Sequence, residues 1–374
     1  MNVYYLNNAA TSWPKAPGTA EAVADAIRNI PFHAARSGFD YGEIKIDNRI
    51  LLAESMRISD ASRIVNCANS THALNIAIHG FPWRKNPAVI TTAAEHNSVL
   101  RPLYYLHQHI NLHTEIIPVD TSGRVIIDKF ETAIKKFSPQ MVVFTHASNV
   151  TGCINPVYEL AAISKKYGAV VLLDASQTMG LVDVTPELWG VDLVAFTGHK
   201  YLLGPGGTGG LYISKNINLE PVWVGGTGIH SDLDEMPTEM PIRFEAGTPN
   251  DASFAGLTSA LKWQKDNPFD PDELNNKIER LSSGLIEAGA KVVRISSPRT
   301  PVVSFTLPGV ETEEAGEILF KSFDIVCRTG LHCAPLIHSF LETGPQGNIR
   351  FSLSRFTTEE EVDYALSAIR SVLE

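Results

Sequence analysis

Hydrophobic residues follow two alternating patterns along the chain. Short, nearly continuous apolar runs are typical of strands buried on both faces, and longer stretches with apolar residues every three or four positions are typical of amphipathic helices. The expected strands cover residues 88–92, 111–119, 140–146, 169–175 and 191–198, and the helices between them include 48–58, 71–80 and 157–168. This alternation predicts an α/β fold with a parallel or mixed sheet.

The pattern changes near residue 256. A long helical run over 277–289 is followed by two short apolar strands, at 292–296 and 302–307, and then by helices over 312–322 and 359–373. This order is typical of a smaller α+β unit. The proline-rich and acidic segment 268–274 is the best candidate for the seam between the two units.

Composition narrows the class of protein. The chain has 374 residues, 44% of them hydrophobic and 19% charged, which is typical of a globular protein of more than one domain. A formal net charge of −10 disfavours nucleic acids and anionic membranes as partners. The N-terminus resembles no secretory signal, so we expect a cytoplasmic protein.

Four cysteines without a CxxC pair predict free thiols in a reducing compartment. No metal site is expected. Among His107, His109 and His113, helical spacing fits only the last two, and no carboxylate or thiolate partner lies close in sequence.

The segment 191–214 carries the strongest chemical signal. A buried strand ends at Thr197-Gly198-His199-Lys200 and leads into a glycine-rich turn, but a further strand follows instead of the helix that a dinucleotide site requires. A lysine in this position can form a Schiff base with an aldehyde cofactor when its pKa is depressed. Taken alone, it is more often a surface residue in a turn.

Other strand ends carry polar residues that each have two readings. Asp174, with Gln177 after it, could keep a pyridine nitrogen protonated or could cap a helix. His96 could stack on a flat ring or occupy a loop, and Asn149 could bind a ring oxygen or shape a turn. Thr71 lies at a helix start, which could bind phosphate or be an ordinary cap. Because several strand ends each carry a polar residue that could bind part of a cofactor, the sequence favours a cofactor site.

These motifs, in this order, resemble the fold type I pyridoxal-phosphate enzymes of the class V aminotransferase group, and within it the type II cysteine desulfurase and selenocysteine lyase branch. The resemblance also rests on the motifs FEAGTPN (244–250) and RTGLHCA (328–334) and on Arg350. It implies a large domain, residues 14–255, with a mostly parallel mixed sheet. It also implies a small α+β domain, residues 1–13 and 256–374, which carries the catalytic cysteine.

The resemblance implies that Lys200 binds the aldehyde of pyridoxal 5'-phosphate, that Asp174 pairs with the pyridine nitrogen and that His96 stacks on the ring. Gln177 and Asn149 would lie near the ring oxygen and the substrate. The residues implied in phosphate binding are Thr71, His72, Thr197 and His199. Thr248 would reach the phosphate of a neighbouring subunit, so a homodimer is implied.

The resemblance assigns the substrate carboxylate to Arg350, with Arg328 as a second candidate. The forked guanidinium suits a carboxylate, although a surface ion pair is the alternative for both residues. Cys333 matches the catalytic cysteine, whose thiolate takes the sulfur of L-cysteine as a persulfide while alanine leaves. Arg328 and His332 are expected to favour that thiolate, and Cys327 is expected to be an inert core thiol.

The sequence departs from the type II pattern at Leu331, at Thr357 and over residues 32–42. These differences leave open the choice between L-cysteine and L-selenocysteine and the sulfur acceptor, for which a protein partner is one candidate. Another class V aminotransferase, lyase or epimerase activity is an alternative that Cys333 disfavours. A cysteine hydrolase or a non-enzymatic sulfur relay would leave Lys200 and Asp174 unexplained.

Overall fold

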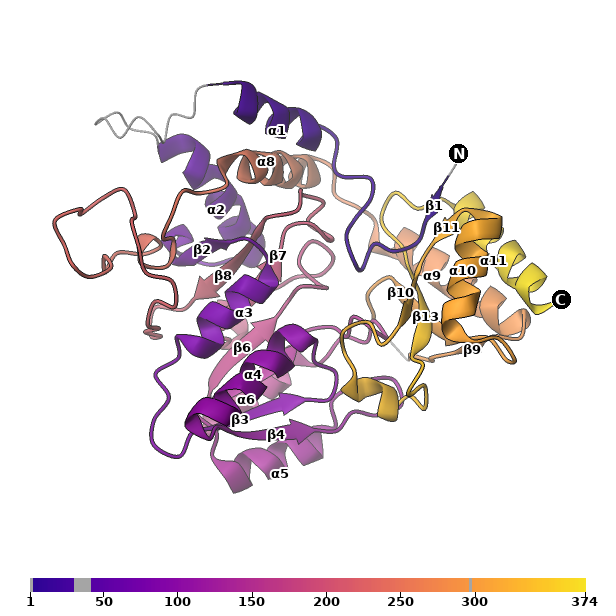
Figure 1. The fold of residues 1–374 in the computed structure, drawn as a ribbon, viewed down its shortest axis with the longest axis horizontal. Coiled ribbons are helices and arrows are strands. Elements are labelled where there is room, and N and C mark those ends of the chain that lie inside the picture. The colour runs from indigo at the N-terminus through magenta and orange to yellow at the C-terminus, as the bar shows by residue number, and fades with distance from the viewer. Residues whose placement is uncertain (1–2, 30–41, 296–297) are drawn as a thin grey trace.

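A seven-stranded sheet forms the centre of the larger half of the molecule in the computed structural model, which describes residues 3–29, 42–295 and 298–374 (Figure 1). Its order is β2-β8-β7-β6-β5-β3-β4, and β8 runs antiparallel to both of its neighbours while β3 to β7 are parallel. The strands are β2 (Ile64–Cys67), β3 (Ala88–Thr92), β4 (His113–Ile117), β5 (Met141–Thr145), β6 (Val170–Asp174), β7 (Leu193–Thr197) and β8 (Gly209–Ile213).

The five strands expected from the sequence are confirmed as β3 to β7, and the mostly parallel sheet is confirmed with them. Every residue of β3, β5 and β7 is buried, which explains their continuous apolar character. The sequence departs from the type II pattern over residues 32–42, and residues 32–41 of this segment lie outside the described part of the chain.

Helices cover both faces of this sheet and define two hydrophobic clusters. One cluster contains side chains of α3 and α4, and the other contains side chains of α2, α5, α6 and α8. The helices of this half are α1 (Thr19–Arg28), α2 (Gly42–Met56), α3 (Ser70–His79), α4 (Asn97–Ile110), α5 (Ile127–Phe137), α6 (Val157–Lys166), α7 (Pro186–Trp189) and α8 (Asp251–Asp266), with short 3-10 turns η2 (Ala61–Arg63) and η3 (Ile242–Phe244).

A second, smaller sheet has the antiparallel order β12-β13-β10-β9 and packs against α9, α10 and α11 through its own hydrophobic cluster. Thr358 and Glu361 begin α11 with a reciprocal capping box, which satisfies two amides of its first turn. These elements are β9 (Lys291–Val292), β10 (Val302–Thr306), β12 (Arg328–Gly330), β13 (Asn348–Ser352), α9 (Pro271–Glu287), α10 (Thr312–Phe323), η4 (Leu336–Ser339) and α11 (Glu359–Leu373).

The N-terminal segment joins the two halves. Strand β1 (Tyr4–Tyr5) pairs in parallel with β11 (Ile325–Val326), beside the small sheet. Residues 8–12 then cross to the large half, where the amide of Ser12 donates to the His199 carbonyl oxygen at 2.9 Å. The domain limits implied by the family resemblance stay a prediction, and the limit at 255/256 falls inside α8.

No helix within residues 3–29, 42–295 and 298–374 has both the length and the apolar character needed to cross a membrane.

Candidate active site

The carboxyl ends of β3, β5, β6 and β7 bring most of the predicted site residues to one edge of the large sheet. Asp174 is the last residue of β6, and Thr197 is the last of β7, two positions before His199. His96 follows β3, and Asn149 follows β5. Because neighbouring parallel strands end at the same edge, residues far apart in sequence meet there.

Lys200 lies in the turn after β7, among opposing charges. Burial of its ammonium group lowers its pKa to about 8, Asp174 acts in the opposite direction, and Arg350 and Arg328 lower the pKa further. About a tenth of the amine is therefore uncharged at pH 7, far more than for an ordinary lysine. An uncharged amine is the form that reacts with an aldehyde.

The glycine-rich turn after Lys200 has a packing role. A Cβ atom at Gly209 would lie 2.7 Å from the Phe196 carbonyl oxygen and 2.8 Å from the Asn69 Cα. Strand β8 can approach β7 and the start of α3 only without a side chain there. Close packing thus accounts for Gly209 without a bound nucleotide.

Asp174 is buried, and its Oδ1 accepts hydrogen bonds from the amide and the hydroxyl of Ser176. Gln177, three residues on, donates through Nε2 to the Ala9 carbonyl oxygen at 3.0 Å. The Oε1 of Gln177 is buried and has no hydrogen-bond partner among the described residues. Asp174 bonds to a turn and caps no helix, because α7 begins only at Pro186, and Gln177 retains a polar atom for a ligand.

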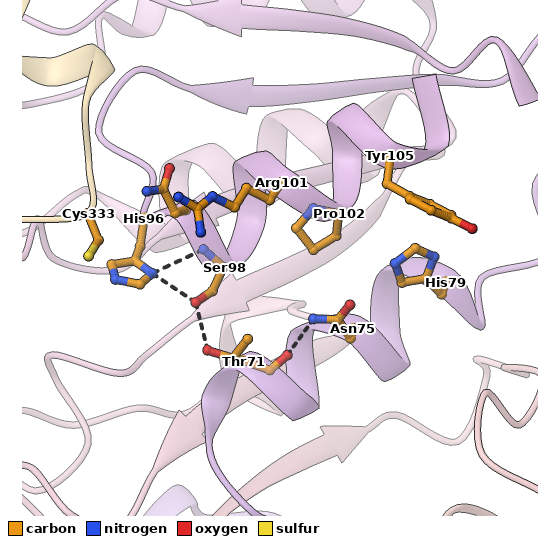
Figure 2. A pocket seen from close by; sticks show the side chains of 10 residues that line it. Thr71, Asn75, His79, His96, Ser98, Arg101, Pro102, Tyr105 and Cys333 are labelled. Atoms are coloured by element: carbon orange, nitrogen blue, oxygen red, sulfur yellow. Dashed lines mark hydrogen bonds between the residues drawn. The ribbon is translucent and has the colours of Figure 1, made fainter. Parts of the chain in front are cut away.

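His96 caps α4 through its ring. Its Nδ1 accepts from the Ser98 amide at 3.0 Å and lies 2.8 Å from the Ser98 hydroxyl, whose oxygen lies 2.8 Å from the Thr71 hydroxyl (Figure 2). Burial lowers the pKa of His96 to about 4, and the Lys200 charge adds to this effect. The imidazole is therefore neutral at physiological pH and has a fixed ring orientation.

The predicted phosphate residues of α3 lie at its first turn. The side chain of Asn69 caps the helix by accepting from the His72 amide at 2.9 Å. The His72 Nε2 is buried without a partner in the described chain, and burial lowers the pKa of this histidine. The helix start thus supplies its dipole and the hydroxyl of Thr71 to one side of the site.

His199 and Thr197 are held by different contacts. Thr197 Oγ1 donates to the Thr208 carbonyl oxygen at 3.3 Å, which ties β7 to the glycine-rich turn. The His199 carbonyl accepts from the N-terminal segment, including Lys15 Nζ at 2.8 Å. Burial lowers the pKa of His199 to about 4, with the charges of Lys200 and Lys15 adding to the effect. Thr248 is exposed on the loop before α8.

Arg350 is a buried guanidinium on β13. Its Nη1 donates to the Asn149 carbonyl oxygen at 2.7 Å, and its Nη2 donates to Asn7 Oδ1 at 3.1 Å. Its Nε is buried without a partner among the described residues, and burial lowers its pKa to about 10. A buried cation with an unsatisfied donor is suited to bind a carboxylate.

Cys333 lies on a tight turn after β12. Both His332 and Cys333 have left-handed backbones, with φ of 51° and 58°, which is uncommon for residues other than glycine. The Asn97 amide donates to the Cys333 carbonyl oxygen at 2.7 Å, and Arg328 Nη2 donates to Cys333 Sγ at 3.1 Å. The small half thereby presents the thiol beside His96, at the start of α4.

The expectation that His332 helps to charge the thiol is wrong. Its ring nitrogen Nε2 lies 2.7 Å from Asn348 Oδ1, and burial lowers its pKa to about 3. A neutral imidazole supplies no positive charge to Cys333. Cys327 agrees with its assignment as an inert thiol, because burial raises its pKa to about 12.

Three residues that contribute to the site were not predicted from the sequence. Asn7 orients Arg350, Lys15 holds the His199 carbonyl, and Glu95 is a fully buried acid that accepts from Thr92 Oγ1 at 2.5 Å and from the Thr145 amide at 3.0 Å. Burial raises the pKa of Glu95 to about 8. Glu95 adjoins His96 in sequence, but an acid in a loop normally indicates a solvated position, so no local signal marks its burial.

A pocket of about 570 Å³ opens beside Cys333, between α3 and α4 (Figure 2). Its lining is polar and aromatic, with residues Thr71, Asn75, His79, His96, Asn97, Ser98, Arg101, Pro102, Tyr105 and Cys333. The pocket therefore gives Cys333 an open side.

The fold and the site together define a class of protein. A mixed, mostly parallel sheet carries a lysine, an aspartate and a histidine at its strand ends, and a small α+β unit adds arginines and a thiol. This is the architecture of fold type I pyridoxal-phosphate enzymes. The chain belongs to the class V aminotransferase family, whose profile, described as "Aminotransferase class-V", matches residues 4–365. The family expected from the sequence is thus confirmed.

Two similar curated proteins share one name. The chain is 31% identical over 321 residues, 81% of its length and 78% of the relative's, to a protein of Methanothermobacter thermautotrophicus named "Probable cysteine desulfurase". A protein of Pyrococcus abyssi with the same name is 29% identical over 388 residues, which cover 100% of this chain and 95% of the relative.

Two solved structures have the same fold as this chain. An apo structure of a cysteine desulfurase from Thermococcus onnurineus NA1 superposes with a TM-score of 0.87 at 27% identity, covering 99% of this chain and 94% of that one. A structure titled "NIFS-LIKE PROTEIN" gives a TM-score of 0.83 at 25% identity, covering 100% and 99% of the two chains. The fold class expected from the sequence is confirmed along the whole described chain.

Proposed function

We propose that this protein is a pyridoxal-phosphate-dependent cysteine desulfurase, which converts L-cysteine into L-alanine and retains the sulfur as a persulfide on Cys333. The observation that carries the proposal is the 3.1 Å contact between the Arg328 guanidinium and Cys333 Sγ, in electrostatic reach of the Lys200 amine. An enzyme that only moves amino groups needs Lys200 and Asp174 but has no use for a thiol held at the substrate site.

The residues present fit the cofactor. Gln177 Oε1, His72 Nε2 and Arg350 Nε are buried polar atoms without a partner among the described residues, and all three belong to residues assigned to the cofactor or the substrate. Buried polar atoms are seldom left unpaired in a native protein unless a ligand or water satisfies them. These three unpaired atoms therefore support a polar ligand between the strand ends and the small half.

Each cofactor residue has a defined task in the proposal. Pyridoxal phosphate, when bound, supplies an electron sink conjugated to the substrate Cα. Asp174 would pair with the pyridine nitrogen, and neutral His96 would lie against the ring. The start of α3, with Thr71 and His72, would hold the phosphate together with Thr197 and His199. Lys200 would bind the aldehyde, and its amine would accept the proton of the substrate Cα.

The substrate is held at both of its ends. The Arg350 guanidinium pairs with the carboxylate of L-cysteine, and Asn149 lies beside it because its carbonyl accepts from Arg350. The Cys333 thiolate, stabilised by Arg328, attacks the substrate sulfur. The S–S bond forms as the Cβ–S bond breaks, the electron pair passes to the carbon skeleton, and protonation yields alanine.

The proposal extends to assembly and location. A homodimer is supported by the exposure of Thr248, which then reaches the phosphate of the neighbouring subunit, and by a cluster of exposed apolar side chains on the preceding loop. These side chains are Val222, Trp223, Val224, Ile229 and Leu233. A cytoplasmic location is supported by the four free cysteines.

The test compares purified wild type with Cys333→Ala and Cys153→Ala after incubation with pyridoxal phosphate. Wild type should absorb visible light and should release alanine and sulfide from L-cysteine in the presence of a reductant. Cys333→Ala should keep the absorbance and lose the sulfide, whereas Cys153→Ala, a buried thiol elsewhere, should keep both. Colourless wild type, or full sulfide release from Cys333→Ala, would refute the proposal. L-selenocysteine in parallel shows which amino acid is preferred.

A further inference from the structure

Tyr201 follows Lys200 in the turn after β7, and the proposed function gives it no task. The residue is only 3% exposed, and its hydroxyl is buried without a hydrogen-bond partner among the described residues. Its ring lies outside the four hydrophobic clusters that the described residues form. Because a buried tyrosine hydroxyl normally finds a partner, this one is available to a ligand.

The N-terminal segment ties the turn that carries Tyr201 to the small half. Two main-chain hydrogen bonds flank Tyr201, because the amides of residues 12 and 16 donate to the carbonyl oxygens of His199 and Leu203, at 2.9 and 3.2 Å. The same segment contacts β13, where Asn7 Oδ1 accepts from Arg350 Nη2 at 3.1 Å. The turn after β7 and the substrate arginine are therefore held by one piece of chain.

The Tyr201 hydroxyl and the Arg350 guanidinium lie within electrostatic reach of each other. Burial raises the pKa of Tyr201, and the positive charge of Arg350 acts in the opposite direction. In return, Tyr201 opposes the lowering of the Arg350 pKa that burial and Arg328 cause. The phenol keeps its proton at neutral pH, so it is a hydrogen-bond donor.

These two buried groups do not satisfy each other. The Tyr201 hydroxyl and Arg350 Nε both have no partner among the described residues, so no hydrogen bond joins them. The other guanidinium nitrogens of Arg350 already donate to Asn149 and Asn7. Two neighbouring donors call for a ligand with two acceptor atoms, and a carboxylate has two acceptor oxygens on one carbon.

We propose that Tyr201 completes the carboxylate site, with its hydroxyl donating to one carboxylate oxygen of L-cysteine while Arg350 Nε donates to the other. The inference rests on the proposed function, because it requires an α-amino acid as the substrate. It adds a substrate-binding residue that neither the sequence motifs nor the relatives' names supply. It also makes the α-carboxylate a feature that the site selects.

The test compares wild type with Tyr201→Phe, both loaded with pyridoxal phosphate. Phenylalanine keeps the ring and removes only the hydroxyl. Because a hydrogen bond to a charged group is lost, KM for L-cysteine and the dissociation constant of L-alanine, followed by cofactor absorbance, should each rise about tenfold. The kcat for sulfide release should change far less. Cysteamine, which has no carboxylate, should bind equally well to both proteins.

Stability gives an independent readout. The hydroxyl has no partner in the free protein, so Tyr201→Phe should not lower the free energy of unfolding in urea without substrate. A hydroxyl with a purely structural role would make the variant less stable and leave the dissociation constant of L-alanine unchanged. Tyr212→Phe is the matched control, because Tyr212 is a buried tyrosine on β8 with Glu187 and Arg63 as charged neighbours, and it should leave KM as in wild type.

The two proposals fail in different ways. Wild type that releases no sulfide from L-cysteine would refute the proposed function itself. Active wild type, together with a Tyr201→Phe variant that binds L-alanine as tightly as wild type does, would overturn only the role of Tyr201. An equal loss of affinity for L-alanine and cysteamine would also overturn it, because the hydroxyl would then not recognise the carboxylate.

Discussion

The Arg328 guanidinium lies 3.1 Å from Cys333 Sγ, although the two residues are separated by a turn with a left-handed backbone. The contact spans the strand β12 and the turn that follows it, so it depends on Gly330, His332 and Cys333 all having positive φ. A cation that donates directly to sulfur can stabilise negative charge that develops on it during a reaction. Arg328 therefore acts on the thiol rather than as a surface ion pair.

Arg328→Gln should slow sulfide release from L-cysteine by about tenfold to a hundredfold, because a hydrogen bond to a charged group contributes about 1.5–3 kcal/mol. Arg328→Lys should slow sulfide release less than Arg328→Gln does. Cofactor absorbance should not change, since Lys200 and Asp174 remain. Arg299→Gln, which removes an arginine paired with Glu279 elsewhere, serves as the control. Equal rates in Arg328→Gln and wild type would contradict the role given to this contact.

Capture of the cofactor should depend on pH through Lys200. Burial lowers the pKa of the amine to about 8, and only the uncharged amine attacks the aldehyde. The rate at which cofactor-free protein gains visible absorbance should rise about tenfold per pH unit below pH 8 and level off above it. Asp174→Asn removes the charge that raises this pKa, so its midpoint should be lower. A midpoint near the ordinary lysine value would show that the amine is not desolvated.

Glu95 should make the protein less stable as pH rises. Its folded pKa, about 8, exceeds the ordinary value of 4.5, so the folded state holds a proton that the unfolded state has released. Its stabilising effect is complete below about pH 4.5 and is lost as pH approaches 8, with an upper limit of several kcal/mol. Glu95→Gln should lose less stability than wild type between pH 5 and pH 8 in urea unfolding. If wild type and Glu95→Gln lose the same stability between pH 5 and pH 8, the proton responsible is not on Glu95.

His332 should position the thiol turn without reacting. Its ring bonds to Asn348, two residues before Arg350 on β13, and its carbonyl accepts from Asn149 Nδ2 at 2.8 Å. His332→Ala leaves Asn348 unpaired and should cost about 1–3 kcal/mol in unfolding free energy. It should also lower kcat for sulfide release more than it changes cofactor uptake.

His332→Asn tolerates the left-handed backbone, so it separates the ring contact from backbone strain. If the ring contact matters, His332→Asn should resemble His332→Ala in kcat but should be the more stable of the two. Wild-type kcat in both variants would show that the ring does not set the thiol position.

Most of the large sheet could be predicted from sequence because a strand buried on both faces must be apolar throughout, and that requirement is local. The five expected strands are β3 to β7. The short strand β9 covers only Lys291–Val292, and its prediction over 292–296 was less accurate because two-residue pairing leaves little pattern. The family followed from the resemblance carried by the order of the motifs, several of which lie at strand ends.

Sequence alone therefore determined the fold class and the family, and it predicted the residues that we propose carry the chemistry. The tertiary structure decided how they are coupled. Glu95 is buried, His332 is neutral and Asn7 orients Arg350 because segments distant in sequence exclude water from these side chains. Burial and long-range hydrogen bonds depend on which elements pack together, so no local pattern encodes them. The pocket beside Cys333 likewise exists only once α3, α4 and the turn after β12 have come together.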